Sequence, residues 1–213
     1  MNGIGEHTRE RFTPALAALA FTVPFVIAAA PAQLDPAETL EYDGSGDTVL
    51  EVVEHDQPRV ASFSHQGSSN FAVWAIDSRG EEQDLLVNTI GPYEGTVLYN
   101  VLVGEDLAAL DISADGTWEV SLKPLEETER WPSGDDEAAG DGDEVLFMEW
   151  EPEGLTVLDI DYGGESNFAI WAYTDSDRDL LVNEIGPYSG QARLVEGTML
   201  LAITAEGGWT LTR

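Results

Sequence analysis

The sequence predicts an all-β protein made of two tandem antiparallel β-sandwich modules, of jelly-roll or immunoglobulin-like type, that arose by internal duplication. One block of sequence occurs twice, within residues 69–95 and again within residues 166–190. Short alternating or apolar runs follow one another with a turn signal about every 8–12 residues, whereas helical periodicity is scarce. Self-similarity of this kind means that one structural unit was repeated, so the fold is predicted once and applied twice.

The repeated block has two parts. Both copies carry Ser-Asn-Phe-Ala-x-Trp-Ala, at residues 69–75 and 166–172, and both continue after a loop with Asp-Leu-Leu-Val-Asn-x-Ile-Gly-Pro-Tyr-x-Gly, at residues 84–95 and 179–190. The loop between the two parts is two residues shorter in the second copy.

Alternation between turn signals predicts seven strands in each copy. In the first copy we expect them near residues 48–53, 58–64, 70–77, 84–90, 95–103, 107–113 and 117–122. In the second copy we expect them near residues 144–150, 155–161, 167–174, 179–185, 190–195, 198–204 and 208–212.

Two kinds of turn recur. Asp115-Gly116 and Gly207-Gly208 favour hairpins, and each is followed by a tryptophan in the last strand of its copy. The Gly-Pro-Tyr-x-Gly segment ends one strand and begins the next, because proline has no N–H and glycine is conformationally free. Tyr93 and Tyr188 therefore stand at a corner, where each phenol either packs over the sandwich end and bonds the backbone or serves as an exposed platform for a ligand.

Five segments are predicted along the chain. Residues 1–32 have the charged start, the apolar run and the small-residue cleavage site of an export signal, and an uncleaved membrane anchor is the alternative. Residues 33–44 form a short leader, 45–125 the first module, 126–142 an acidic linker and 143–213 the second module. Trp131 is expected to pin the linker to one module, because a lone tryptophan in a polar segment usually docks. The protein is therefore expected to be extracellular or at the cell surface, touching a membrane only through an uncleaved signal.

The charge is extreme. Forty-one acidic residues oppose nine basic ones, the formal net charge is −32, and Lys123 is the only lysine. Such self-repulsion is tolerable in brine, where the Debye length falls to about 3 Å at 1 M salt. We therefore interpret the negative charge as an adaptation to a saline habitat. The alternative is that the protein is a polyanion that gathers cations. Nucleic acid is not an expected partner, because its phosphates would be repelled.

No motif of known chemistry is present. The chain has no cysteine, no nucleophile elbow, no phosphate-binding glycine loop and no zinc signature. His55 and His65 are expected to be exposed edge residues, with a catalytic role as the alternative. The alternating acids Asp175, Asp177 and Asp179 suit a Ca²⁺ loop, with an ordinary acidic hairpin loop as the alternative. No other cofactor is expected.

The aromatic residues supply the candidate ligand site. Alternation sets Phe71, Val73 and Ala75 on one face of their strand and Asn70 and Trp74 on the other. If the first face fills the core, the tryptophans lie outside beside amides, as in many sugar-binding sandwiches. The alternative is that the tryptophan face is the inner one or is covered by the other module. The candidate ligand residues are Trp74, Trp171, Asn70, Asn167, Tyr93 and Tyr188.

The duplicated motifs, the acidic surface and the export signal together resemble the exported acidic tandem β-sandwich repeat proteins of halophilic archaea. This resemblance implies a location and no particular activity. The expected function is a non-catalytic exported binding or cell-surface module for glycans or envelope components. Two alternatives remain: a structural, self-associating surface protein, and a hydrolase that uses paired carboxylates.

Overall fold

The computed structural model describes residues 35–102 and 104–213, so the predicted export signal lies outside the described residues. The described chain is all-β, with seventeen strands and one short 3₁₀ turn, η1 (Leu125–Glu127). No helix in this part of the chain has the length and apolar character to cross a bilayer. For description we divide the strands into an N-terminal half (Leu40–Pro124) and a C-terminal half (Glu129–Thr212).

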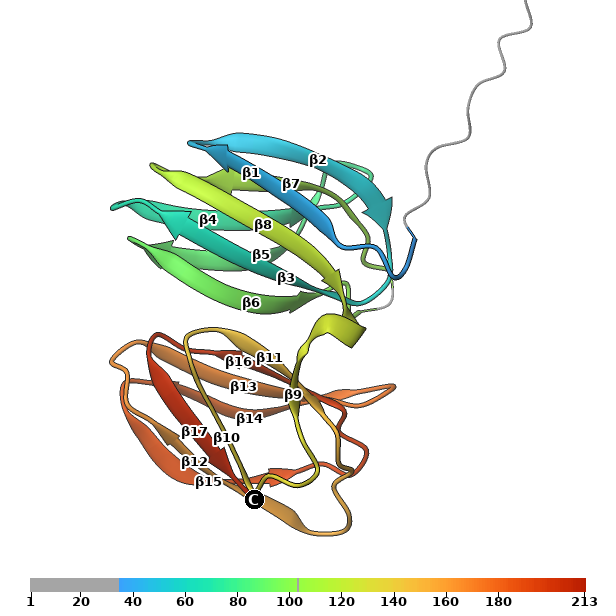
Figure 1. Ribbon diagram of the computed structural model, residues 1–213, viewed down its shortest axis with the longest axis vertical. Coiled ribbons are helices and arrows are strands. Elements are labelled where there is room, and N and C mark those ends of the chain that lie inside the picture. Colours follow the sequence, from blue (N-terminus) through green and yellow to red (C-terminus); the bar gives the residue numbers. More distant parts are fainter. Residues whose placement is uncertain (1–34, 103) are drawn as a thin grey trace, which may run out of the picture. The chain divides into compact units, whose positions relative to one another are not determined.

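The N-terminal half contains two antiparallel sheets (Figure 1). Its strands are β1 (Leu40–Ser45), β2 (Thr48–His55), β3 (Arg59–Gln66), β4 (Asn70–Ile76), β5 (Glu82–Ile90), β6 (Tyr93–Tyr99), β7 (Leu107–Ser113) and β8 (Thr117–Pro124). One sheet has the order β1-β8-β3-β6 and the other has the order β2-β7-β4-β5.

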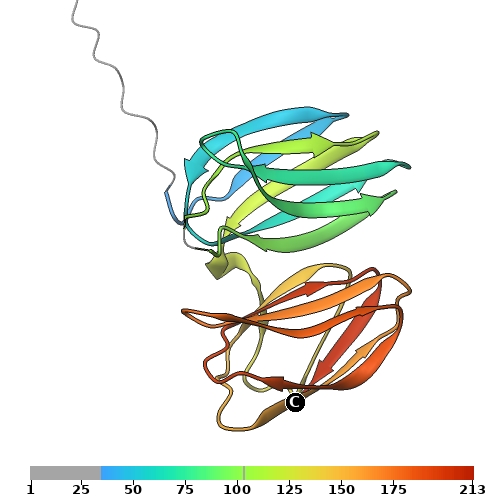
Figure 2. The same cartoon turned by 180° about the vertical axis from the view of Figure 1, so that it is seen from behind.

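The C-terminal half also contains two sheets, seen from both sides in Figures 1 and 2. Its strands are β9 (Glu129–Trp131), β10 (Glu137–Asp141), β11 (Glu144–Met148), β12 (Thr156–Tyr162), β13 (Asn167–Tyr173), β14 (Arg178–Ile185), β15 (Tyr188–Leu194), β16 (Leu200–Thr204) and β17 (Gly208–Thr212). The sheet orders are β10-β17-β12-β15 and β14-β13-β16-β11-β9. Among the described strands, only the β9–β11 pair is parallel.

The strand orders of the two halves correspond position by position once β9 is set aside. Strands β1, β8, β3 and β6 match β10, β17, β12 and β15, and strands β2, β7, β4 and β5 match β11, β16, β13 and β14. The register agrees as well, because β4 and β13 each carry an irregularity directly before their tryptophan, Trp74 or Trp171. All fourteen expected strands are present, with ends shifted by a few residues.

Each half has a core that draws on both of its sheets. In the N-terminal half Phe71, Val73 and Ala75 of β4 pack with Phe63 of β3 and Leu110 of β7. In the C-terminal half the matching face of β13 is buried as well, through Phe168, Ile170 and Ala172. The Phe-Val/Ile-Ala face of the repeated motif is therefore the face that fills the core in both halves.

Three strands were not expected. β1 lies partly within the predicted leader, and β9 and β10 lie within the predicted linker, so residues 126–142 are not a plain connecting segment. Trp131 at the end of β9 is 1% exposed and belongs to the C-terminal core, where its indole N–H donates to the Asp135 carbonyl at 3.0 Å. The docking expected of Trp131 is confirmed.

A second repeated motif explains β1 and β10. Residues 44–47 read Gly-Ser-Gly-Asp and residues 140–143 read Gly-Asp-Gly-Asp. The second glycine of each has positive φ, 71° at Gly46 and 82° at Gly142, which glycine adopts at little cost. The aspartate of each then accepts a backbone N–H from the strand end across the turn, Ala114 for Asp47 at 2.9 Å and Ala205 for Asp143 at 2.8 Å.

Candidate functional site

The two predicted tryptophan platforms lie on outer sheet faces, but their surroundings differ. Trp74 and Trp171 are both half-buried, and Asn70 and Asn167 are exposed at the starts of the same strands. The guanidinium of Arg178 lies 4.7 Å from the centre of the Trp171 ring, in cation–π geometry. Trp171 is thus partly covered by its own chain, whereas no described cation stacks on Trp74. The two copies of the motif therefore do not present two equal platforms.

The corner tyrosines keep the same pose and have different partners. Tyr93 packs on Phe71 at 5.9 Å between ring centres, and Tyr188 packs on Phe168 at 6.0 Å. The Tyr93 phenol donates at 2.6 Å to the Asp143 carboxylate of the other half, which corrects the expected bond to the backbone. Within the described residues, no hydrogen bond involves the Tyr188 phenol.

The Tyr93–Asp143 contact belongs to a joint between the halves. The joint contains an apolar cluster made by Val60 and Leu98 from the N-terminal half with Val145 and Leu200 from the C-terminal half. The Thr96 N–H also donates to the Asp143 carbonyl at 2.8 Å. The outer face of the sheet β1-β8-β3-β6 therefore packs on the outer face of β11 and β16.

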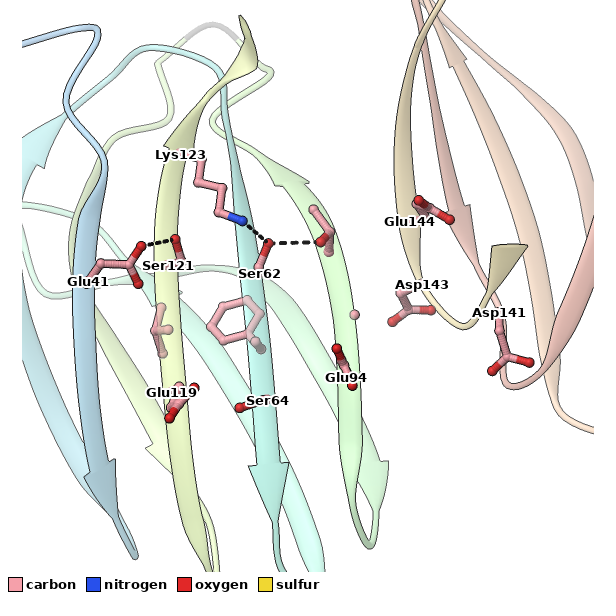
Figure 3. A pocket seen from close by; sticks show the side chains of 14 residues that line it. Glu41, Ser62, Ser64, Glu94, Glu119, Ser121, Lys123, Asp141, Asp143 and Glu144 are labelled. Carbon is pink, nitrogen blue, oxygen red and sulfur yellow. Dashed lines mark hydrogen bonds between the residues drawn. The ribbon is translucent and has the colours of Figure 1, made fainter. Parts of the chain in front are cut away.

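Beside the joint the same sheet face lines an acidic cleft of about 560 Å³ (Figure 3). Residues of β1, β8, β3 and β6 form one wall and the turn between β10 and β11 forms the other. The polar lining residues are Glu41, Ser62, Ser64, Glu94, Thr96, Glu119, Ser121, Lys123, Asp141, Asp143 and Glu144.

Hydroxyl groups and the single lysine form two separate sets of hydrogen bonds on this wall. Lys123 Nζ donates to Ser62 Oγ at 3.2 Å, and Ser62 and Thr96 share a hydrogen bond of 2.9 Å. Ser121 donates to Glu41 Oε1 at 2.7 Å. With six carboxylates around one ammonium group, the cleft carries a strongly negative field that suits a cationic or hydroxyl-rich ligand.

Two carboxyl groups of the cleft are perturbed. Burial raises the pKa of Asp143, although the bonds from Tyr93 and Ala205 oppose the rise. Burial and the nearby Glu129 raise the pKa of Glu144. Both oxygens of Asp143 are occupied, one by the Ala205 N–H and the other by the Tyr93 phenol, so this carboxyl group is engaged in structure.

Two of the predicted ligand residues come together in a second cleft. Tyr93 and Asn167 line it, along with Asn88, Ile90 and the 204–207 turn. Asn70, Trp74, Trp171 and Tyr188 do not line this cleft. The six candidate residues therefore do not form a single binding surface.

The predicted calcium loop does not gather its acids. Asp175, Asp177 and Asp179 are exposed, and no group of three or more metal-ligating side chains exists within residues 35–102 and 104–213. Asp177 Oδ1 instead accepts the Arg178 N–H at 2.8 Å, and Asp179 already lies in β14 opposite Ala172. This stretch is a tight turn into a strand, and the pleat points alternate side chains apart.

The histidines are buried, contrary to expectation. His65 is fully buried, stacks on Phe71 at 4.4 Å and bonds the Gly91 carbonyl through Nδ1 at 2.8 Å. His55 is 8% exposed, and its Nε2 is 2.8 Å from the Tyr99 hydroxyl. Both rings serve packing, and neither lines the acidic cleft.

Sequence reasoning missed the joint and the acidic cleft. The repeated Gly-x-Gly-Asp motif was the signal available for the joint, since it ends in the carboxylate that Tyr93 bonds. Comparison of the chain with protein-family models and with curated proteins gave no match.

Proposed function

We propose that this protein is a non-catalytic, exported cell-surface module in which two duplicated β-sandwiches bind other surfaces through their outer sheet faces. Duplication is supported by the matching strand orders and by the shared irregularity before Trp74 and Trp171. The sandwich arrangement is supported by cores that each draw on two sheets. Export is supported by the sequence of residues 1–32, and the charge of −32 favours a saline surrounding.

The observation that carries this proposal is the joint. There an outer sheet face of this fold accepts protein, through an apolar cluster of Val60, Leu98, Val145 and Leu200 and a phenol-to-carboxylate bond. A hydrolase is the weaker alternative, because both oxygens of the cleft carboxyl group Asp143 are already engaged.

Retention on cell envelopes tests the proposal. Purified protein is mixed with envelopes of a halophilic archaeon in molar NaCl, and the bound fraction is measured after centrifugation. We expect saturable retention that an unrelated acidic protein of similar charge does not show. Retention no greater than that control would overturn the proposal.

Glycan binding at Trp74 is a second candidate, favoured by its half-buried ring on the same outer strand face as the exposed Asn70. One sugar ring of a longer glycan would stack on the indole while the amide bonds a hydroxyl of another sugar along the strand. Trp74→Ala should then reduce retention on envelopes, and periodate oxidation of the envelopes should do the same. Trp171→Ala is the matched control, because Arg178 already occupies that ring. Equal loss in both variants, or none in either, would count against a glycan site at Trp74.

A further inference from the structure

We infer that copies of this protein associate head to tail, by repeating between chains the joint that the two halves make within one chain. The outer face of β12 and β15 in one copy would dock on the outer face of β2 and β7 in the next. This inference rests on the proposed function, because it names a second copy as one partner of the outer sheet faces.

The Tyr188 phenol has no hydrogen-bond acceptor among the described residues. Tyr188 has the pose of Tyr93, with the same packing on a core phenylalanine, and Gly190 lies beneath its ring as Gly95 lies beneath Tyr93. Tyr93 donates to Asp143, the last residue of the second Gly-x-Gly-Asp motif. The corresponding residue of the first motif is Asp47, which is exposed and uses Oδ1 for the Ala114 N–H. A hydrogen bond from Tyr188 of one copy to Asp47 of the next would be the counterpart of the Tyr93–Asp143 bond within the chain.

Two exposed valines occupy the positions of two buried residues of the joint. Strand register equates Val60 with Val157, because Phe63 pairs with Gly95 as Ile160 pairs with Gly190. It also equates Val145 with Val49. Val145 pairs with Ala202 and Val49 pairs with Asp111, and these two partners pair in turn with the equivalent tryptophans Trp171 and Trp74. Val60 and Val145 are buried in the joint, whereas Val49 is 64% and Val157 37% exposed. The apolar centre of a second joint is thus present and uncovered.

The two docking faces also carry complementary charges. The position of Leu98 in the joint is taken by Arg193 on β15. The positions of Phe147 and Ala202 on the opposing face are taken by Glu51 and Asp111. Where the joint within the chain has an apolar contact, the contact between chains would therefore have an arginine that faces two carboxylates. Such a pairing fixes the register and the choice of partner.

The two docking faces differ, so the contact is heterologous and generates rings or open chains of copies. Each copy carries a formal charge of −32, and screening by salt is needed before such copies can approach. Association should therefore appear at molar salt and weaken in dilute buffer, which is the opposite of what a purely ionic contact would do.

Sedimentation velocity of the purified chain over a wide concentration range in molar KCl tests the inference. We expect species heavier than the monomer that grow with concentration. Arg193→Glu should weaken association by about tenfold or more, the loss expected for reversing one interfacial charge. Asp111→Arg combined with Arg193→Glu should restore it. Tyr188→Phe should weaken it without changing the fold measured by circular dichroism.

Tyr93→Phe is the matched control. It removes the corresponding hydroxyl group from the joint within the chain, and it should leave association between copies unchanged. A monomer at every concentration would overturn the inference, and so would association that ignores both Arg193→Glu and Tyr188→Phe. If the chain binds envelopes yet stays monomeric, the proposed function stands and only self-association fails. If the chain self-associates yet does not bind envelopes, self-association stands and the proposed function fails.

Discussion

The indole N–H of Trp118 donates to the Gly46 carbonyl at 3.1 Å, and its ring lies against Gly44 on the neighbouring strand β1. The second half repeats the arrangement with Trp209, the Gly142 carbonyl at 3.0 Å, and Gly140 on β10. A Cβ atom at either Gly44 or Gly140 would overlap the indole. Because Gly44 and Gly140 have no side chain, β1 and β10 can each pack closely over the buried tryptophan.

Gly44→Ala should lower the free energy of unfolding by about 1–3 kcal/mol, the usual cost of overpacking a core. The added methyl group would meet an aromatic ring that is fixed by its own hydrogen bond. Denaturant unfolding measures the change. Gly134→Ala is the matched control, because no atom lies within 4 Å of its Cβ position, and its effect should stay within about 0.5 kcal/mol. A neutral Gly44→Ala variant would show that β1 does not close on Trp118.

Asp143 should make stability depend on pH. Burial raises its pKa in the folded protein above the ordinary value of 3.8, so the folded state holds the proton more tightly than the unfolded chain. The stability linked to this proton is present at low pH and is lost as pH rises from about 4 through the raised pKa. Melting temperatures of the wild type and of Asp143→Asn should diverge across this window. That of the wild type should fall relative to that of the variant as pH rises.

The amide introduced by Asp143→Asn can still accept from the Ala205 N–H and donate to the Tyr93 oxygen, so the joint is retained in this variant. Asp47→Asn is the control, since Asp47 makes the same turn contact in an exposed position. A difference between wild type and Asp143→Asn that stays constant with pH would contradict the role given to burial.

His65→Tyr tests the duplication. Register places Tyr162 at the position of His65, and both rings stack on a core phenylalanine, at 4.3 Å on Phe168 and 4.4 Å on Phe71. The Tyr variant should lie within about 1.5 kcal/mol of the wild type. His65→Ala should lose about 2–4 kcal/mol, because it opens a cavity beside Phe71. If Tyr proves as damaging as Ala in urea unfolding, the two positions are not equivalent.

Salt should stabilise the fold steeply. With a net charge of −32 and one lysine, self-repulsion is strong in dilute buffer and is screened at molar salt. Melting temperatures measured by circular dichroism should rise from dilute buffer to molar KCl or NaCl. A melting temperature that does not change with salt would mean that the carboxylates are neutralised locally, and would point to bound divalent cations.

The sequence by itself determined the strands whose alternation is strong, the Gly-Pro-Tyr-x-Gly turns and the division of the repeated motif into two faces, but not which of these faces points inward. These features depend on periodicity and on turn chemistry, which act between neighbours in the chain. They sufficed for fourteen of the seventeen strands, whereas the burial of Phe71 and Phe168 is shown only by the structure.

Only the tertiary structure decided the remaining features. β1, β9 and β10 are rich in polar or small residues and become strands because β8, β11 and β17 offer them a paired edge. His65 is buried because a core phenylalanine and the Gly91 carbonyl receive its ring. Tyr93 and Tyr188, identical in motif, differ because one meets Asp143 and the other does not. A residue's neighbours along the chain fix its conformation, but the partners that desolvate it arrive from distant segments, and the repeat alone could not reveal them.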